Sequence, residues 1–182
     1  MIQYLILLAF LISLQPAPAE ASKPVLGKSC MLTKSLQIDD LVDKSAKIFV
    51  GEFLSAKESR VKGLDVRELH FQVTEPIKGL KSSKKAIVIK EWARAKSPFV
   101  DQVEKNKKYV FFFYEDSTRG LSSLVGFEQG LARVNNSNQL SFSKRVNIKP
   151  RKSSKLSLAS AQRASIPSEI RTVSDLKTLI KT

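Results

Sequence analysis

Hydrophobic and polar residues alternate through the middle of the chain in the pattern of β-strands. Apolar residues occupy every second position of residues 68–74 (ELHFQVT), which predicts a strand with one buried face. Residues 47–54 (KIFVGEFL) and 86–92 (AIVIKEW) are rich in β-branched and aromatic side chains and predict two more strands. Residues 109–114 (YVFFFY) are apolar throughout, so we expect a central strand buried on both faces.

Shorter apolar segments and turns complete a mainly β domain. Residues 124–134 (LVGFEQGLARV) are interrupted by two glycines, and we interpret them as a bent strand or two short ones. Residues 140–142 and 146–148 are expected to add pairing at the sheet edge. Gly51 inside the first strand predicts a β-bulge or a sharp bend. The second strand is expected to end at Pro76 and the glycine and serines that follow it.

One helix is predicted at each end of this β region. Residues 36–43 place apolar side chains on one side and aspartates on the other, which favours a short helix. Between Ile170 and Ile180, apolar residues recur at helical spacing, and Thr172 or Ser174 is expected to cap this second helix. Residues 150–165 are polar and basic, which is typical of a linker or a loosely held arm.

The first 21 residues have the organisation of a secretory signal peptide. Residues 4–14 (YLILLAFLISL) form an uncharged apolar run, and a membrane span needs about 20 apolar residues. Small residues suit cleavage after Ala19 or Ala21, although no Lys or Arg precedes the run, and a buried N-terminal strand or helix is the alternative. We therefore expect export to the periplasm or the extracellular space. The expected parts are a signal peptide (1–21), a β domain (22–148), and a basic linker with a C-terminal helix (149–182).

The composition fits one domain that is stabilised by packing rather than by disulfides. Hydrophobic residues make up 42% of the chain, which is enough for a real core. Cys30 is the only cysteine, so no disulfide can form within the chain. Cys30 is either a small buried apolar residue or a thiol that links two chains, and it cannot form a cysteine-based metal site alone.

The charge is strongly positive and unevenly distributed. The chain holds 31 Lys and Arg against 17 Asp and Glu, which gives a formal net charge of +14. Basic residues far outnumber acidic ones over residues 78–96 and again over 144–182. Clusters of this kind indicate attraction to a polyanion or an anionic surface, although they also occur on basic exported proteins as solvated faces.

The order of these segments resembles the netrin-like domain, as in tissue inhibitors of metalloproteinases. The closest local matches are residues 41–53 (LVDKSAKIFVGEF) and 71–80 (FQVTEPIKGL), after the early Cys30. Residues 109–114 followed by 123–134 (SLVGFEQGLARV) are also similar to exported bacterial proteins of unassigned function. The resemblance covers about Cys30 to Val134. It implies a five- to six-stranded OB-like β-barrel.

The inhibitory mechanism of that family is not implied for this chain. The animal inhibitors depend on several disulfides, and their mature N-terminal cysteine chelates the zinc of the target. Cys30 lies well beyond the expected cleavage site, so its amine is in a peptide bond. The resemblance therefore implies a fold, and a protease-inhibitor-like module is only a further alternative for the function.

The chain lacks the motifs of common catalytic centres. His70 is the only histidine, and it falls on the polar face of its predicted strand. No His-Glu-x-x-His, Gly-x-Ser-x-Gly or P-loop pattern occurs, and the carboxylates are scattered. Ser-x-x-Lys pairs occur without the partner motifs of the penicillin-recognising enzymes. We therefore expect no enzymatic activity, no cofactor and no metal site.

Binding is the function that these patterns favour, and two kinds of partner compete. The first is a protein in the envelope or extracellular space, with Trp92 and Phe99 as exposed aromatic anchors unless both lie in the core. The second is an anionic polymer or a membrane surface, bound by basic residues around a stacking aromatic, with no specific nucleic acid. A dimer linked through Cys30 stays open. The candidate binding residues are Lys84, Lys85, Lys90, Trp92, Arg94 and Lys96.

Overall fold

The computed structural model describes residues 34–95, 97, 99, 102–142, 146–150 and 167–181. All of them belong to one unit, Thr33–Thr182. Several predictions concern residues that lie outside the described ones. These are the predicted signal peptide, Cys30, Lys96 and nearly all of the predicted linker. Of the helices that are described, none is long and apolar enough to cross a membrane.

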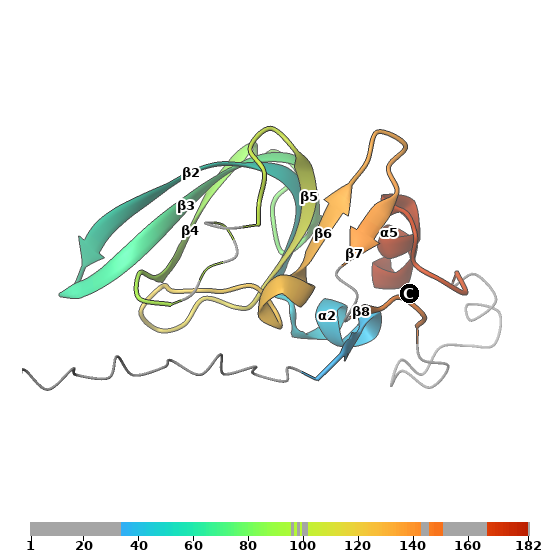
Figure 1. Ribbon diagram of the computed structural model, residues 1–182, viewed down its shortest axis with the longest axis horizontal. Coiled ribbons are helices and arrows are strands. Elements are labelled where there is room, and N and C mark those ends of the chain that lie inside the picture. The colour runs from blue at the N-terminus through green and yellow to red at the C-terminus, as the bar shows by residue number, and fades with distance from the viewer. Residues whose placement is uncertain are drawn as a thin grey trace, which may run out of the picture. The chain divides into compact units, whose positions relative to one another are not determined.

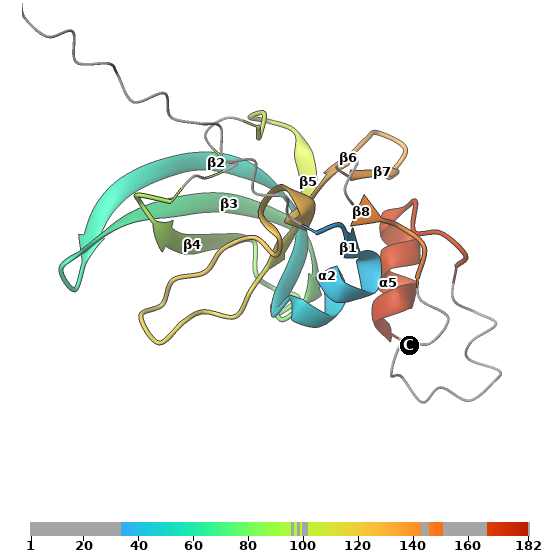
Figure 2. The ribbon, with the colours of Figure 1, turned by 60° about the horizontal axis from the view of Figure 1, so that its bottom comes forward.

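A six-stranded antiparallel sheet is the frame of the domain (Figure 1). Its strands lie in the order β4-β3-β2-β5-β6-β7. The strand bounds are β2 (Lys47–Val61), β3 (Leu64–Lys78), β4 (Ala86–Trp92), β5 (Lys108–Phe113), β6 (Leu131–Val134) and β7 (Leu140–Phe142). The helical elements are α2 (Ile38–Lys44), a 3-10 turn η1 (Phe127–Gly130) and α5 (Val173–Lys181). Two short strands, β1 (Leu36–Gln37) and β8 (Val146–Asn147), form a separate parallel pair beside α2 and α5 (Figure 2).

The prediction of a mainly β domain with a helix at each end is confirmed, and the main difference lies in the lengths of two strands. β2 and β3 continue beyond the predicted segments and form a long hairpin (Figure 1). β3 runs through Pro76, so the turn expected there is wrong. Pro76 pairs with Phe49 beside a register shift between Ile48 and Phe49, and proline is tolerated at such irregularities because fewer ladder hydrogen bonds are required.

Glycines mark the two places where the chain of this hairpin approaches other backbone closely. The bulge predicted at Gly51 is confirmed by a register shift between Val50 and Gly51. A Cβ atom at Gly51 would overlap the carbonyl oxygen of Gln72 on β3. The turn after β3 is made at Gly79, whose φ of +72° favours glycine and whose missing Cβ leaves room for the carbonyl of Ala46.

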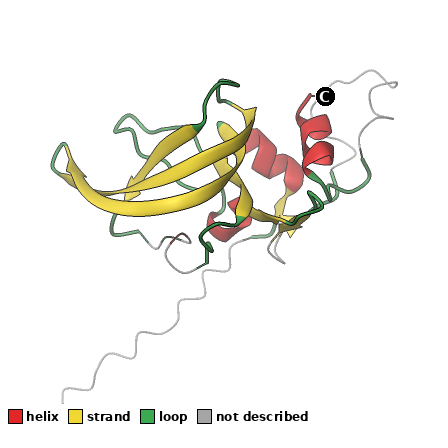
Figure 3. Ribbon diagram, turned by 90° about the horizontal axis from the view of Figure 1, so that it is seen from above, coloured by secondary structure: helices red, strands yellow, loops and turns green. Residues whose placement is uncertain are grey.

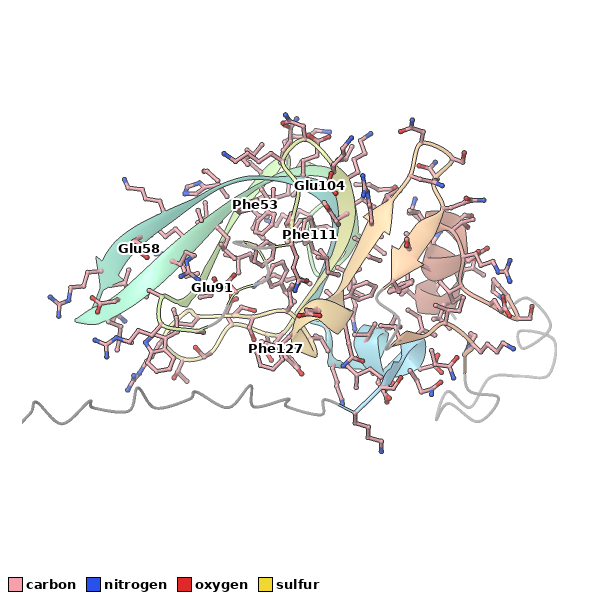
Figure 4. All side chains as sticks on the ribbon, viewed as in Figure 1. Phe53, Glu58, Glu91, Glu104, Phe111 and Phe127 are labelled. Carbon is pink, nitrogen blue, oxygen red and sulfur yellow. The ribbon has the colours of Figure 1, made fainter. Side chains whose placement is uncertain are left out.

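β5 is buried on both faces, as expected, and separates two hydrophobic cores. One core is rich in phenylalanine and lies on the concave side of the sheet (Figure 4). It includes Phe49, Phe53, Phe71, Phe99, Phe111 and Phe113. The other core lies between the opposite faces of β2 and β5 and the two helices, which sit at the same end of the sheet (Figure 3). It includes Ile48, Val50, Val110, Phe112, Leu41 and Leu176.

Hydrogen bonds at their ends fix both helices to this second core. The N–H of Asp175 donates to Thr172 Oγ1 at 3.1 Å, and the N–H of Thr172 donates to Asp175 Oδ2 at 2.9 Å. This reciprocal capping identifies Thr172, rather than Ser174, as the capping residue of α5. Before α5, a hydrogen bond from Arg171 and its positive charge lower the pKa of Glu169. Lys78 Nζ at the end of β3 donates to the carbonyl of Val42 in α2 at 2.7 Å.

The sheet is open at β4 and β7. Among the described residues, no pairing joins β4 to β6 or β7, so a closed barrel is not found. β7 is partly covered, because Leu140 N–H donates to the carbonyl of Arg171 at 2.7 Å. At the outer edge of β4, the carbonyl of Lys90 accepts a hydrogen bond from Ser122 N–H in the loop after β5.

We predict that Phe71→Ala lowers the free energy of unfolding by about 3–5 kcal/mol, measured by urea denaturation. Phe71 is fully buried. Its ring centroid lies 4.8 to 5.7 Å from those of five other phenylalanines, namely Phe49, Phe53, Phe99, Phe111 and Phe113. The matched control is Phe127→Ala, whose ring is exposed and should contribute little to stability. Equal losses in the two variants would contradict the assignment of the core.

Candidate binding cleft

A cleft of about 330 Å³ lies between the end of β4 and the loop of residues 114–124 that follows β5. Beside the buried Phe99, three exposed aromatic side chains from three different segments line it: Trp92 of β4, Tyr114 after β5, and Phe127 of η1. They are 52%, 38% and 55% exposed, respectively. They are three of the five large hydrophobic side chains that are exposed in the described part of the chain. The cleft therefore brings together the large aromatic side chains that are exposed in the described part of the chain.

Alternation along β4 places Trp92 at the rim of the cleft. Ile87 and Ile89 belong to the phenylalanine-rich side, whereas Val88, Lys90 and Trp92 point to the other face. Trp92 is the last residue of the strand, and its carbonyl accepts a hydrogen bond from the N–H of Ala95 at 3.0 Å. The strand thus ends in a tight turn with the indole ring exposed.

A mostly buried ion pair lies beneath the cleft. Glu91 lines the cleft and accepts a hydrogen bond from Arg67 Nη1 at 2.7 Å. Arg67 Nη2 donates to the carbonyl of Ala93 at 2.8 Å, so the guanidinium joins β3 to the turn after β4. Each charge of the pair is therefore compensated by the other, and no unpaired ionised group is left at the floor of the cleft. The hydrogen bonds also fix the geometry of this floor.

The loop that forms the opposite wall is held by hydrogen bonds. Ser122 N–H donates to the carbonyl of Lys90 at 2.8 Å, and Ser122 Oγ donates to the carbonyl of Tyr114 at 2.7 Å. Tyr114 N–H donates to the carbonyl of Ser123 at 3.0 Å. Asp116 pairs with Lys47 of β2 at 2.5 Å. The cleft is therefore shaped in advance of any ligand.

Phe127 is held at the rim in an unfavourable backbone conformation. Both Gly126 and Phe127 have left-handed φ values, 64° and 58°. Such a conformation is unusual for a bulky side chain, costs about 1–3 kcal/mol, and concentrates at functional sites. The buried Gln129 fixes this turn, because its Oε1 accepts from Leu36 N–H at 2.8 Å and its Nε2 donates to the carbonyl of Lys34. Figure 4 shows Phe127 apart from the labelled Phe53 and Phe111 of the phenylalanine-rich core.

The structure separates the two predicted aromatic anchors. Trp92 is exposed, as that prediction requires. Phe99 is only 4% exposed, so its role as an exposed anchor is wrong, and the alternative that it lies in the core is confirmed. Its ring stacks on Phe113 with centroids 6.1 Å apart and lies 5.4 Å from Phe53, which explains why a residue of a polar loop is buried.

The predicted basic residues that the structure describes lie along β4 and beyond both of its ends. Lys84 and Lys85 are exposed and precede β4, whereas Trp92 ends it. Seven extended residues separate these ends by about 20 Å. Lys90 shares the outer face of β4 with Trp92, and its Nζ lies 3.5 Å from Glu68 Oε1.

Arg94 and the single histidine, His70, do not line the cleft. Arg94 follows β4, and its Nη2 lies 3.7 Å from Asp65 Oδ2. His70 is half-buried on β3, in register between Ser55 and Val88. Within the described part of the chain, no group of three or more His, Cys, Asp or Glu side chains is arranged to hold a metal ion.

We predict that Glu91→Gln lowers the free energy of unfolding by about 3 kcal/mol, because it leaves the guanidinium of Arg67 buried without a counter-charge. The double variant Arg67→Met with Glu91→Leu should recover most of this loss, since it removes both charges. Urea denaturation of the three proteins measures both effects. If Glu91→Gln were as stable as the parent protein, water would solvate the Arg67 guanidinium, and the prediction of a buried ion pair would be contradicted.

Comparison with known proteins identifies no relative of this chain. No family model matches it, and neither a curated protein nor a solved structure matches it. The function is therefore inferred from the cleft and the strands around it.

Proposed function

We propose that the protein is a non-catalytic binding protein that recognises a protein partner through the aromatic cleft. The observation that carries this proposal is the exposure of Trp92, Tyr114 and Phe127 around one cleft. Large aromatic side chains dominate the binding energy of protein interfaces when they fill well-packed central pockets. The left-handed conformation of Phe127 also supports a function, because it holds a side chain that is more than half exposed.

The cleft fits the side chains of a partner rather than a large molecule. A volume of about 330 Å³ is at the small end of ligand pockets and accommodates one or two apolar side chains. The hydrogen bonds of Ser122 and the Arg67–Glu91 pair fix its walls and floor. A preformed site loses little conformational entropy on binding, which increases affinity.

The finer fold assignment is part of this proposal. We place the domain with OB-like, netrin-like barrels that are partly open. The concave phenylalanine-rich core and the contact between Ser122 and β4 support this assignment. The apolar run and small residues of the first 21 residues support export, so we expect the partner in the periplasm or the extracellular space.

A second candidate is an anionic polymer or membrane surface bound by the basic end of β4. It is favoured by the net charge of +14 and by the exposure of Lys84 and Lys85. Neither lysine has an ion-pair partner among the described residues.

We predict that Trp92→Ala and Phe127→Ala each weaken binding of the native partner about tenfold or more, because each removes a large aromatic contact that lines the cleft. The partner is first isolated by crosslinking to the mature protein in its native extract, and its affinity for each variant is then measured. The control is Leu54→Ala, which removes an exposed apolar side chain of β2 that does not line the cleft. Equal affinities for the parent and both cleft variants would contradict the proposal.

A further inference from the structure

We infer that β4 binds an extended acidic peptide segment, which adds as a strand at its outer edge, where no other strand of the described residues pairs with it. This inference rests on the proposed function as a protein binder and names the chemistry of the partner. Three features of the described residues meet at this edge: backbone groups directed away from β3, unpaired lysines, and an exposed apolar side chain. Strand addition uses the same features in general, since main-chain hydrogen bonds give affinity and alternate side chains give specificity.

The hydrogen-bond pattern shows which backbone groups of β4 are directed outward. The carbonyl of Lys85 accepts a hydrogen bond from Val73 N–H of β3 at 2.8 Å. The backbone N–H and C=O groups of Lys85, Ile87 and Ile89 are therefore directed toward β3. The residues between them therefore direct their N–H and C=O groups to the outer edge. The carbonyl of Lys90 confirms this alternation, because it accepts from Ser122 N–H in the loop.

The outer edge around Val88 is the segment that remains for a partner. Among the described residues, the carbonyls of Lys90 and Trp92 accept backbone hydrogen bonds at the outer edge of β4, from Ser122 and Ala95, and both lie at the cleft end. Ala86 and Val88 continue the edge toward Lys85, and Val88 is 46% exposed. A peptide paired with Ala86 and Val88 would point toward the cleft beside Trp92.

The charge of this edge selects an acidic segment. Lys81, Lys84 and Lys85 are exposed in the turn before β4, and the described carboxylates make no ion pair with them. Two acidic residues of β3 near this edge already have partners: Glu75 pairs with Lys177, and Glu68 lies against Lys90 and accepts a hydrogen bond from Ser59. Lysines on an edge strand also repel a second copy of the same edge, which disfavours self-pairing.

The first test measures whether charge at this edge governs binding. The probe is a labelled peptide of alternating Glu and Val, titrated with the full mature protein and followed by fluorescence anisotropy. We expect Lys84→Glu with Lys85→Glu to weaken binding about tenfold, because two attractions become repulsions. The matched control, Lys105→Glu with Lys107→Glu, reverses two exposed lysines of another loop and should leave the affinity within about twofold.

The second test measures whether the backbone of the edge is required. Val88→Pro removes an outward N–H while the bonds to β3 remain, and we expect it to weaken peptide binding about tenfold, with Val88→Thr as the control. A peptide of the same length and charge, in which proline replaces every valine, should bind equally weakly to the parent protein. This peptide keeps the test valid if Val88→Pro reduces stability.

The outcomes separate this inference from the proposed function. If heparin and both acidic peptides bind alike and Val88→Pro has no effect, the edge is a charge-only polyanion surface and strand addition is overturned. If neither peptide binds, the inference is also overturned. In that case, loss of native-partner binding in Trp92→Ala would still support the proposed function of the cleft. If Trp92→Ala also bound the native partner as tightly as the parent protein, both proposals would be overturned.

Discussion

Phe111 and Phe112 of β5 point to opposite faces of the sheet, and each is fully buried. Burial on both faces requires a cover on each side, and the two covers differ. Phe111 packs in the phenylalanine cluster on the concave side, whereas Phe112 packs beneath α2 and α5. Because side chains in such cores are close-packed, the positions of β2, β3 and both helices are tied to this one strand.

The candidate site lies where this packing ends. Phe99 and Leu124 belong to the phenylalanine-rich core and also line the cleft, so the core is the back wall of the site. Beyond them the chain exposes Trp92, Tyr114 and Phe127, which the core does not require. A rigid back wall with an exposed aromatic rim suits recognition of a partner that inserts its own apolar side chains.

Local patterns predicted the elements, and long-range contacts decided the site. The apolar run of β5, the bulge at Gly51 and the cap at Thr172 follow from neighbouring residues, and each was predictable. The burial of Phe99 depends on rings from three distant strands, which the spacing of its own loop does not reveal. The positions of Tyr114 and Phe127 at the cleft were not predicted, because contacts from Lys34, Leu36 and Ser123 hold them. The glycines flanking Phe127 were the one local signal.

The account depends most on β4 being an open edge beside the cleft, and amide hydrogen exchange of the free protein tests this directly. Hydrogen bonding to β3 should make the N–H groups of Ile87 and Ile89 exchange slowly, whereas the outward N–H of Val88 should exchange much faster. This alternation would show an edge that is available to a partner. Equal, strong protection at Val88, Ile87 and Ile89 would contradict the account, because it would show that the edge is already covered.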